Sequence, residues 1–249
     1  MKKIAISNKG YKRENNQDYQ LMDSHNRYFI IADGMGGHKG GEVASYTAVT
    51  TAHRLLKNYN AKSLPQIEAK LIEVFNAANE AVYNMSFSKE SLVGMGTTMI
   101  VSYLFEKNIV IAHVGDSRAY LFSGEDFIRL TKDQSLVQEM IDRGELNQIQ
   151  AAVHPKRHMI TKAIGTQSSI KPDVLTRELL PKAVSELFMC TDGLTDYVSD
   201  DEMKNICNHS DILEDSVNDM LELALKRGGY DNISISAIRL SESWGVVSV

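Results

Sequence analysis

The chain is poor in cysteine and in proline. It has two cysteines, Cys190 and Cys207, and four prolines among its 249 residues. Two cysteines cannot make a disulfide framework, and their spacing excludes the CxxC pairs of a structural zinc site. A chain of this length buries enough surface to fold without either kind of cross-link. We therefore expect a globular protein of a reducing compartment, the cytoplasm.

Basic charge is not in excess, and the sequence has no long apolar run. The chain carries 27 Lys and Arg residues against 32 Asp and Glu residues, a formal net charge of −5. General binding to nucleic acid or to an anionic membrane needs a basic surplus, so we predict neither partner. The longest nearly apolar stretch, Thr97 to Phe105, is about half as long as a membrane span.

Hydrophobic patterning predicts strands at both ends of the chain and in its middle, with helices between them. The predicted strands are 4–7, 19–22, 28–32, 97–104, 109–114, 119–122, 127–130, 187–190 and 233–240. The predicted helices cover 42–57, 67–82, 135–143 and 213–224. Ser63 with Gln66 predicts a capping box before the second helix, and Asp211 with Glu214 predicts the cap of the fourth.

This order of elements predicts sheets that are covered by helices on their outer faces. No linker interrupts the pattern, so residues 1–240 are predicted to form one domain, followed by a tail at 241–249. The stretch 145–171 has weak periodicity and leaves the main body as an excursion. It carries His154, Arg157 and His158, which could grip substrate but which we interpret as part of a solvated basic loop.

One short pattern occurs twice in the chain. Asp33-Gly34 and Asp192-Gly193 each follow an apolar strand and precede an apolar residue. A single Asp-Gly pair is usually only a turn. Asp116, in Gly115-Asp116, and Asp231, after Gly228-Gly229, add two more aspartates at strand edges beside glycine.

Four such aspartates could converge on one margin of a sheet. Clustered carboxylates repel one another and hold their pKa values high unless a cation neutralises them. Carboxylate, carbonyl and water oxygens are the ligands that Mg²⁺ and Mn²⁺ prefer, and no histidine pair carries the HExxH motif of a zinc hydrolase. The pattern therefore favours a magnesium or manganese site.

Arg13 lies in a polar segment before a predicted strand. By default it is a solvated surface residue. Beside a site with two metal ions it would instead suit the oxygens of a phosphate, which a guanidinium binds in a bidentate manner. Three other residues are interpreted more plainly: His113 and Cys190 as core packing, and His38 as either a proton donor or a helix-entry residue.

An ordered set of motifs now spans about residues 8 to 240. The set comprises Arg13 with Asn16-Gln17-Asp18, Ala32-Asp33-Gly34-Met35-Gly36-Gly37-His38, Gly94-Met95-Gly96-Thr97-Thr98, Val114-Gly115-Asp116-Ser117-Arg118, Cys190-Thr191-Asp192-Gly193-Leu194 and Asp231-Asn232-Ile233. The chain resembles the bacterial PPM (type-2C) metal-dependent serine/threonine protein phosphatases. It departs from many eukaryotic relatives, which have a histidine where Met35 stands here.

The resemblance implies an α+β fold, a four-layer α-β-β-α sandwich in which helix pairs flank a central antiparallel β-sandwich, with a small flap at about 145–171. It implies two tightly bound Mn²⁺ or Mg²⁺ ions. Asp33 would bridge them, the carbonyl of Gly34 would bind one of them, and Asp192 with Asp231 would complete the pair. Asp18 would hold metal-bound water, and a weaker third ion would bind Asp116 together with Asp192.

The same resemblance implies hydrolysis of phosphoserine and phosphothreonine monoesters in proteins. A hydroxide shared by the two ions would attack phosphorus in line while Arg13 binds the phosphate oxygens. His38 could protonate the leaving alkoxide, or a metal-bound water could do so. The expected partners are phosphorylated proteins, a bacterial Ser/Thr kinase among them, and the enzyme is expected to be a cytoplasmic monomer.

Two other functions remain open at this point. A pseudophosphatase would bind phosphoproteins on the same fold without hydrolysing them, and the loss of a metal aspartate would indicate it. None of the expected aspartates is missing from the chain. A phosphatase of small phosphomonoesters is the other alternative, and a comparison of phosphopeptides with small phosphates separates it from a protein phosphatase.

Overall fold

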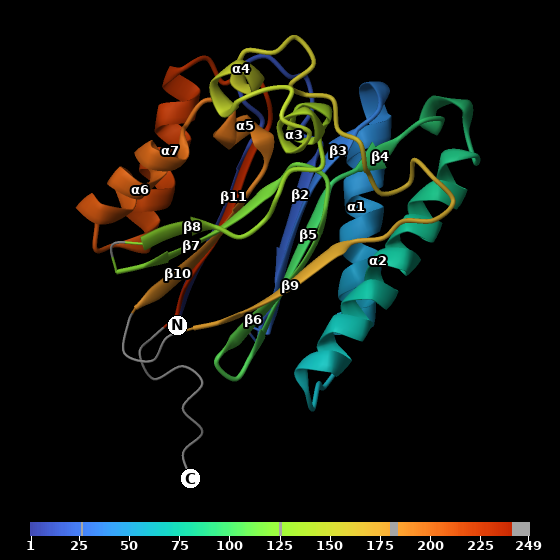
Figure 1. Ribbon diagram of the computed structural model, residues 1–249. Coiled ribbons are helices and arrows are strands. Elements are labelled where there is room, and N and C mark those ends of the chain that lie inside the picture. Colours follow the sequence, from blue (N-terminus) through green and yellow to red (C-terminus); the bar gives the residue numbers. More distant parts are fainter. Residues whose placement is uncertain (26, 125, 180–183, 241–249) are drawn as a thin grey trace.

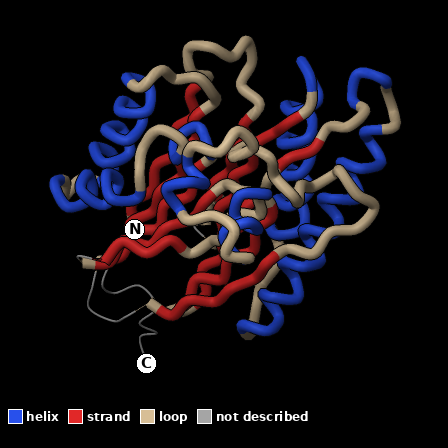
Figure 2. The backbone as a smooth tube through the Cα atoms, turned by 45° about the horizontal axis from the view of Figure 1, so that its top comes forward, coloured by secondary structure: helices blue, strands red, loops and turns tan. Residues whose placement is uncertain are grey.

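Two antiparallel sheets lie face to face between two layers of helices, as Figure 1 shows. The computed structural model describes residues 1–25, 27–124, 126–179 and 184–240, and the side chains of all of these except 37–39. Figure 2, turned from that view, shows the strands between the outer helices and the loops that gather at one end. The predicted four-layer α+β sandwich is confirmed, whereas the tail at 241–249 lies outside the described residues.

The first sheet contains both the first and the last strand of the chain. Its order is β1 (Lys2–Asn8), β11 (Ile233–Leu240), β10 (Ser185–Cys190), β7 (Arg118–Ser123) and β8 (Asp126–Arg129). Helices α6 (Asp200–His209) and α7 (Leu213–Lys226) cover its outer face.

The second sheet is built from the strands between these. Its order is β2 (Asp18–Met22), β3 (Tyr28–Met35), β5 (Met99–Phe105), β6 (Asn108–Val114) and β9 (Asp173–Glu178), and the short β4 (Gly96–Thr97) pairs with β3. Helices α1 (Gly37–Leu56) and α2 (Leu64–Ser86) cover its outer face, and a single turn of 3-10 helix, Glu90–Leu92, follows them.

Strand β3 shows why its sequence is apolar without alternation. Phe29 and Ile31 pack between the two sheets, whereas Tyr28, Ile30 and Ala32 pack under α1 and α2. A strand that is covered on both faces needs apolar side chains at every position, because successive side chains point to opposite faces. Strand β10 is buried in the same way on both of its faces.

The predicted face of the second helix is confirmed. Its apolar residues are fully buried: Ile67, Leu71, Val74, Phe75, Ala78 and Val82. The capping box is wrong, because the Ser63 side chain makes no capping hydrogen bond, and the backbone N–H of Lys62 donates instead to Gln66 Oε1 at 3.1 Å. Pro65 does lie in the first turn.

The predicted cap of the last helix is also wrong. Residue Ile212 occupies the N-cap position of α7 and offers no side-chain oxygen, and the Ser210 hydroxyl accepts the Ile212 backbone N–H at 3.1 Å. Helix α6 was not predicted from periodicity, although Ser199 and Glu202 form a true capping box at its start. Strand β9 was not predicted either, since its residues are mostly exposed at a sheet edge.

Helix α1 begins at Gly37, five residues before the predicted start at Glu42. Its first turn is rich in glycine, which by propensity alone disfavours a helix. The reason is packing: a Cβ atom on Gly41 would lie 2.5 Å from the Gly34 carbonyl oxygen. Only a residue without a side chain lets the helix start approach strand β3 this closely.

The stretch 145–171, predicted as an excursion, contributes no named strand to either sheet. It contains the short helix α4 (Gln148–Ala152), which Asn147 and Gln150 cap reciprocally. The preceding helix α3 (Leu136–Asp142) confirms the helix predicted over 135–143, and its N-cap Ser135 accepts from the Gln138 backbone N–H through its side chain. Across the described residues, every helix is too short or too polar to cross a membrane.

Candidate active site

The carboxylates predicted to cluster come from both sheets and meet at one end of the sandwich. Asp18 begins β2 and stands directly opposite Asp33 of β3 in the antiparallel register. Asp116 follows the end of β6, Asp192 follows the end of β10, and Asp231 precedes β11. Since β10 and β11 are neighbours of opposite direction, the end of one and the start of the other lie together.

Asp33 is held by the loop between β4 and β5. Its backbone N–H donates to Thr98 Oγ1 at 2.9 Å, and its carbonyl oxygen accepts from the Thr98 N–H and the Thr97 hydroxyl, both at 2.8 Å. The Thr98 hydroxyl is also 2.7 Å from that of Ser117. These bonds connect the strand end that carries Asp33 to the loop that carries Asp116.

The loop of Asp116 is fixed by a side chain from farther along the chain. Gln134 Oε1 accepts from the Gly115 N–H at 2.9 Å, and the Gln134 N–H donates to the Gly115 carbonyl at 3.0 Å. This two-way contact holds the backbone next to Asp116 in place.

Close backbone contacts explain both Asp-Gly pairs. A Cβ atom on Gly34 would lie 2.0 Å from the Gly41 carbonyl oxygen, and one on Gly193 would lie 2.0 Å from the Asn232 carbonyl oxygen. The two pairs nevertheless differ locally, because Asp33 lies inside β3 while Asp192 opens the short helix α5 (Asp192–Thr195). In each case glycine brings two chain segments together at the carboxylate cluster.

A cavity of about 830 Å³ opens at this end of the sandwich. Six predicted site residues line it: Arg13, Asp33, Gly34, Asp116, Asp192 and Asp231. Asp18 lies behind them, 7% exposed, and its Oδ2 accepts from the Thr191 hydroxyl at 2.9 Å. The side chain of His38 lies outside the described residues, so its role stays a prediction.

Burial and mutual repulsion hold these carboxyl groups close to protonation. Burial raises the pKa of Asp18 to about 7 and that of Asp192 to about 6. The pKa values of Asp33 and Asp116 are also raised well above the usual range, first by burial and then by the charges of neighbouring aspartates. Two buried oxygens of the cluster, Asp18 Oδ1 and Asp192 Oδ1, have no hydrogen-bond donor within the described structure.

These observations fit a site for divalent cations. The donor set is made of oxygen alone, which Mg²⁺ and Mn²⁺ prefer. Unpaired buried carboxylate oxygens cost free energy unless a cation or a donor satisfies them. The residues present therefore match the two-metal site that the sequence predicts.

Arg13 is the one arginine of the cluster that bonds to a candidate metal ligand within the described residues. Its Nη2 donates to Asp231 Oδ2 at 2.7 Å, and this bond raises the pKa of the guanidinium. The side chain is 53% exposed and lines the cavity. Its other N–H groups can therefore reach a ligand inside the cavity.

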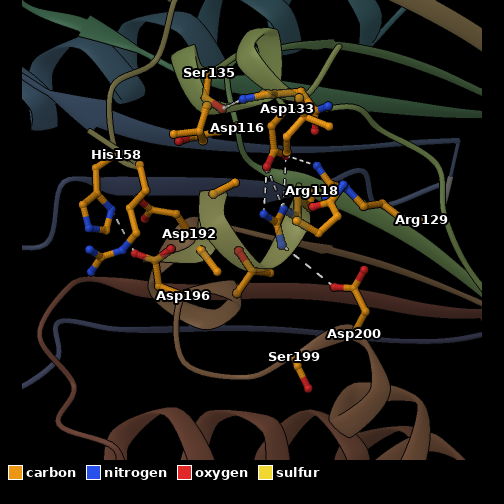
Figure 3. A pocket seen from close by; sticks show the side chains of 18 residues that line it. Asp116, Arg118, Arg129, Asp133, Ser135, His158, Asp192, Asp196, Ser199 and Asp200 are labelled. Carbon is orange, nitrogen blue, oxygen red and sulfur yellow. Dashed lines mark hydrogen bonds and ion pairs between the residues drawn. The ribbon is translucent and has the colours of Figure 1, made fainter. Parts of the chain in front are cut away.

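Sequence reasoning missed the pairing of His158 with Asp196. His158 Nδ1 lies 3.1 Å from Asp196 Oδ2, and candidate ligand atoms of these two residues and Asp192 lie within 4.8 Å of one another (Figure 3). The interpretation of His158 as part of a solvated loop does not account for this contact. The position of Asp196, four residues after Asp192, was the available signal, because that spacing brings two side chains to one side of a helical turn.

Asn232 is a second residue whose role the sequence did not show. Its Nδ2 donates to the carbonyls of Lys9 and Asn15, at 2.9 and 3.0 Å, and its Oδ1 accepts from the Gln17 N–H at 2.8 Å. It thus ties the N-terminal loop that carries Arg13 to the segment of Asp231.

The residues interpreted as packing are buried. Cys190 is fully buried, and burial raises the pKa of its thiol to about 12, so it is not a nucleophile at neutral pH. His113 is 2% exposed in β6, and burial lowers the pKa of its imidazole. Both residues lie outside the carboxylate cavity.

Comparison with known proteins decides the family. The family model described as protein phosphatase 2C matches residues 9–228. The chain belongs to the protein phosphatase 2C family. It is a serine/threonine protein phosphatase of the bacterial PPM type.

Three relatives show how far the likeness extends. Protein phosphatase PhpP of Streptococcus pneumoniae is 32% identical over 240 residues, which covers 95% of this chain and 96% of that protein. The crystal structure of Stp1 from Staphylococcus aureus superimposes with a TM-score of 0.90 at 31% identity, covering 96% of this chain and 94% of that one. The catalytic domain of the phosphatase PstP, solved with two manganese ions, has a TM-score of 0.84 at 30% identity, covering 96% and 98%.

Proposed function

We propose that this phosphatase hydrolyses phosphoserine and phosphothreonine esters at the carboxylate cluster, with two Mn²⁺ or Mg²⁺ ions. The observation that carries the proposal is the set of buried aspartates that have no cationic partner among the described residues, beside a cavity that Arg13 lines. The relative PstP was solved with two manganese ions, which supports the same use of the cluster here. One domain, residues 1–240, would contain the whole site.

Each residue has a proposed part in holding the ions. The carboxylates of Asp33, Asp192 and Asp231 and the carbonyl of Gly34 would bind the pair. Asp18, behind Asp33, keeps Oδ1 free of any described donor and can accept a hydrogen bond from water. When bound, the two ions supply an acidified water as nucleophile for in-line attack at phosphorus, and they supply positive charge for the phosphate oxygens.

Arg13 would bind the substrate. Its bond to Asp231 fixes one side of the guanidinium, and the remaining N–H groups can donate to two phosphate oxygens. The leaving alkoxide needs a proton, for which His38 and water are the candidate donors.

A third, weaker ion would bind Asp116 and Asp192. Titration calorimetry with Mn²⁺ tests this point, since Asp116→Ala should lose only the weakest binding event.

A metal-dependence assay tests the function. We expect Mn²⁺-dependent release of phosphate from phosphoserine and phosphothreonine peptides, abolished by a chelator and restored by excess Mn²⁺. Binding of the peptide without hydrolysis would show a pseudophosphatase. A much higher kcat/KM for small phosphomonoesters than for the peptides would show a small-molecule phosphatase. The natural partner is proposed to be a Ser/Thr kinase and its substrates, because only such a kinase makes the ester that is removed.

A further inference from the structure

Asp116 lies in a tight bend of the backbone at the wall of the catalytic cavity. It follows the end of β6, and the residue before it, Gly115, has a φ of 103°, a left-handed conformation that favours glycine. A side chain in such a bend points where the backbone directs it. The position of the Asp116 carboxylate therefore depends on the contacts that hold the bend.

Two consecutive residues, Asp133 and Gln134, hold this bend at its two ends. At one end Gln134 Oε1 accepts from the Gly115 N–H at 2.9 Å, and the Gln134 backbone N–H donates to the Gly115 carbonyl at 3.0 Å. At the other end the Asp133 carboxylate accepts from Arg118 Nη2 at 2.7 Å (Figure 3). Asp116 stands between the two anchored residues, so its backbone is restrained from both sides.

The amide of Gln134 is oriented in turn by Asp173. Gln134 Nε2 donates to Asp173 Oδ2 at 2.8 Å, and Asp173 is the first residue of β9. A carboxylate can only accept, so the NH₂ end of the amide must face Asp173. The carbonyl end is then presented to the Gly115 N–H, which can only donate. Both bonds thus require the same orientation of the amide.

The two members of this pair differ in exposure. Gln134 is 7% exposed, whereas the Asp173 side chain is 55% exposed and lies 3.8 Å from Lys162 Nζ. The Gln134 carbonyl accepts from the Thr161 N–H at 2.8 Å, which fixes its backbone as well. A buried amide that is held at every end can orient the residue beside it. Partners that orient a metal ligand without touching the ion commonly set its affinity.

We propose that Gln134 and Asp173 form a positioning pair for Asp116. The pair holds the bend in the geometry in which the Asp116 carboxylate takes part in binding the weakest metal ion. The proposal rests on the proposed function, which assigns that ion to Asp116 and Asp192. Neither member of the pair is itself a ligand, so its contribution acts through the Asp116 backbone.

Titration calorimetry with Mn²⁺ on a variant of similar length tests the pair. Gln134→Met removes both side-chain hydrogen bonds and keeps the length of the side chain. We expect its weakest Mn²⁺ binding event to weaken by about tenfold or more, while the tighter events stay within about twofold of the parent. An unchanged weakest event would overturn the proposal, even with a lower melting temperature, because a merely structural role changes stability alone.

A double variant exchanges donor and acceptor within the pair. Gln134→Glu places a second carboxylate against Asp173, so the weakest event should weaken, whereas a plain charge effect would tighten Mn²⁺ binding. Adding Asp173→Asn supplies an amide that donates to the new carboxylate and restores the net charge of the pair. The weakest event should then return to within about threefold of the parent.

The double variant is compared with its parent at pH 8, where carboxyl groups are ordinarily ionised. A double variant that binds the weakest ion no better than Gln134→Glu alone would overturn the pair. Gln138→Met is the matched control, because Gln138 Nε2 donates to Asp142 Oδ1 at 3.0 Å on α3, in a pair that does not touch the bend. The control should bind Mn²⁺ like the parent, and an equal loss in it would also overturn the proposal.

Asp116→Ala separates this proposal from the proposed function. If that variant loses the weakest event and Gln134→Met keeps it, the positioning pair is refuted and the third ion stands. If the parent shows no weak event that Asp116→Ala removes, the third ion is refuted and the positioning pair with it. Mn²⁺-dependent hydrolysis by the parent reports the two tighter ions in either case.

Discussion

Buried carboxylates occur in two settings in this molecule. In the scaffold each has an arginine: Glu186, 3% exposed, pairs with Arg239, and Asp23, 4% exposed, pairs with Arg27 at 3.3 Å. In the candidate active site Asp18, Asp33, Asp116 and Asp192 form no ion pair with Lys or Arg within the described part of the chain.

The presence or absence of an arginine partner distinguishes carboxylates that stabilise the fold from carboxylates that serve the candidate active site. A buried carboxylate that meets an arginine in good geometry is satisfied, and removing its partner destabilises the fold. A cluster without a counter-charge works against folding and is retained for a ligand that brings positive charge. Arg13 fits this view, because it lies half exposed at the rim of the cavity and forms its ion pair, among the described residues, with the outermost aspartate, Asp231.

The largest expected effect is on activity. Asp33→Asn and Asp192→Asn should each lower kcat for a phosphopeptide by about a thousandfold or more, because a lost ligand removes the charge that stabilises the transition state. Both variants should fold, and without metal they should melt at a higher temperature than the parent, since one repelling charge is gone. Turnover within tenfold of the parent at any Mn²⁺ concentration would refute the assignment.

The scaffold carboxylate Glu186 should show the opposite behaviour. Glu186→Gln leaves Arg239 without its counter-charge and should lower the free energy of unfolding by about 3 kcal/mol. The kcat of the folded protein should stay unchanged, because Glu186 does not line the catalytic cavity. Urea titration of one preparation measures the free energy of unfolding, and steady-state kinetics on the same preparation measure kcat. A Glu186→Gln variant that keeps its stability and loses activity would contradict the assignment of Glu186 to the scaffold.

The metal-free protein should lose stability as the pH rises. The pKa values of Asp192, about 6, and Asp18, about 7, lie above their unfolded value near 3.8. The contribution of these two carboxyl groups to the free energy of unfolding is therefore fully present below about pH 4, and it is lost as the pH rises through 6 to 7. Between pH 5 and pH 8 the melting temperature should fall by roughly 10 °C.

A matched variant isolates that effect. Buried His113 acts in the opposite direction, since its lowered pKa makes it destabilising at acid pH. Asp192→Asn keeps His113, so the difference between the two melting curves reports the carboxylate alone. Saturating Mn²⁺ should flatten the curve of the parent. Parallel curves for parent and variant in the absence of metal would contradict the prediction.

The smallest expected effect concerns the partly exposed arginine. Arg13→Ala should raise KM for a phosphopeptide by about tenfold and change kcat less, because a phosphate clamp contributes mainly to ground-state binding. Arg13→Lys should restore only part of the affinity, since the bidentate fork is lost. Initial-rate kinetics measure KM and kcat of both variants. An unchanged KM in the alanine variant would show that Arg13 is a surface residue without a part in substrate binding.

Local patterns predicted most of the scaffold. The buried face of α2 follows from its helical spacing, and the apolar runs of β3 and β10 follow from burial on both faces. Helix α6 was missed because it has few apolar residues, although the Ser199–Glu202 capping box marked its start. Strand β9 was missed because an exposed edge strand has no clear alternation.

The sequence by itself determined which residue types stand at the strand ends, because aspartate and glycine at those positions are visible in the linear chain. It also determined the layered class of fold, since the spacing of apolar residues encodes which faces are covered. Which aspartates meet was decided only by strand pairing: β10 and β11 bring Asp192 and Asp231 together across 39 positions. The same holds for the contact of His158 with Asp196 and for that of Gln134 with Asp173, because the path of the excursion depends on packing that no local pattern records.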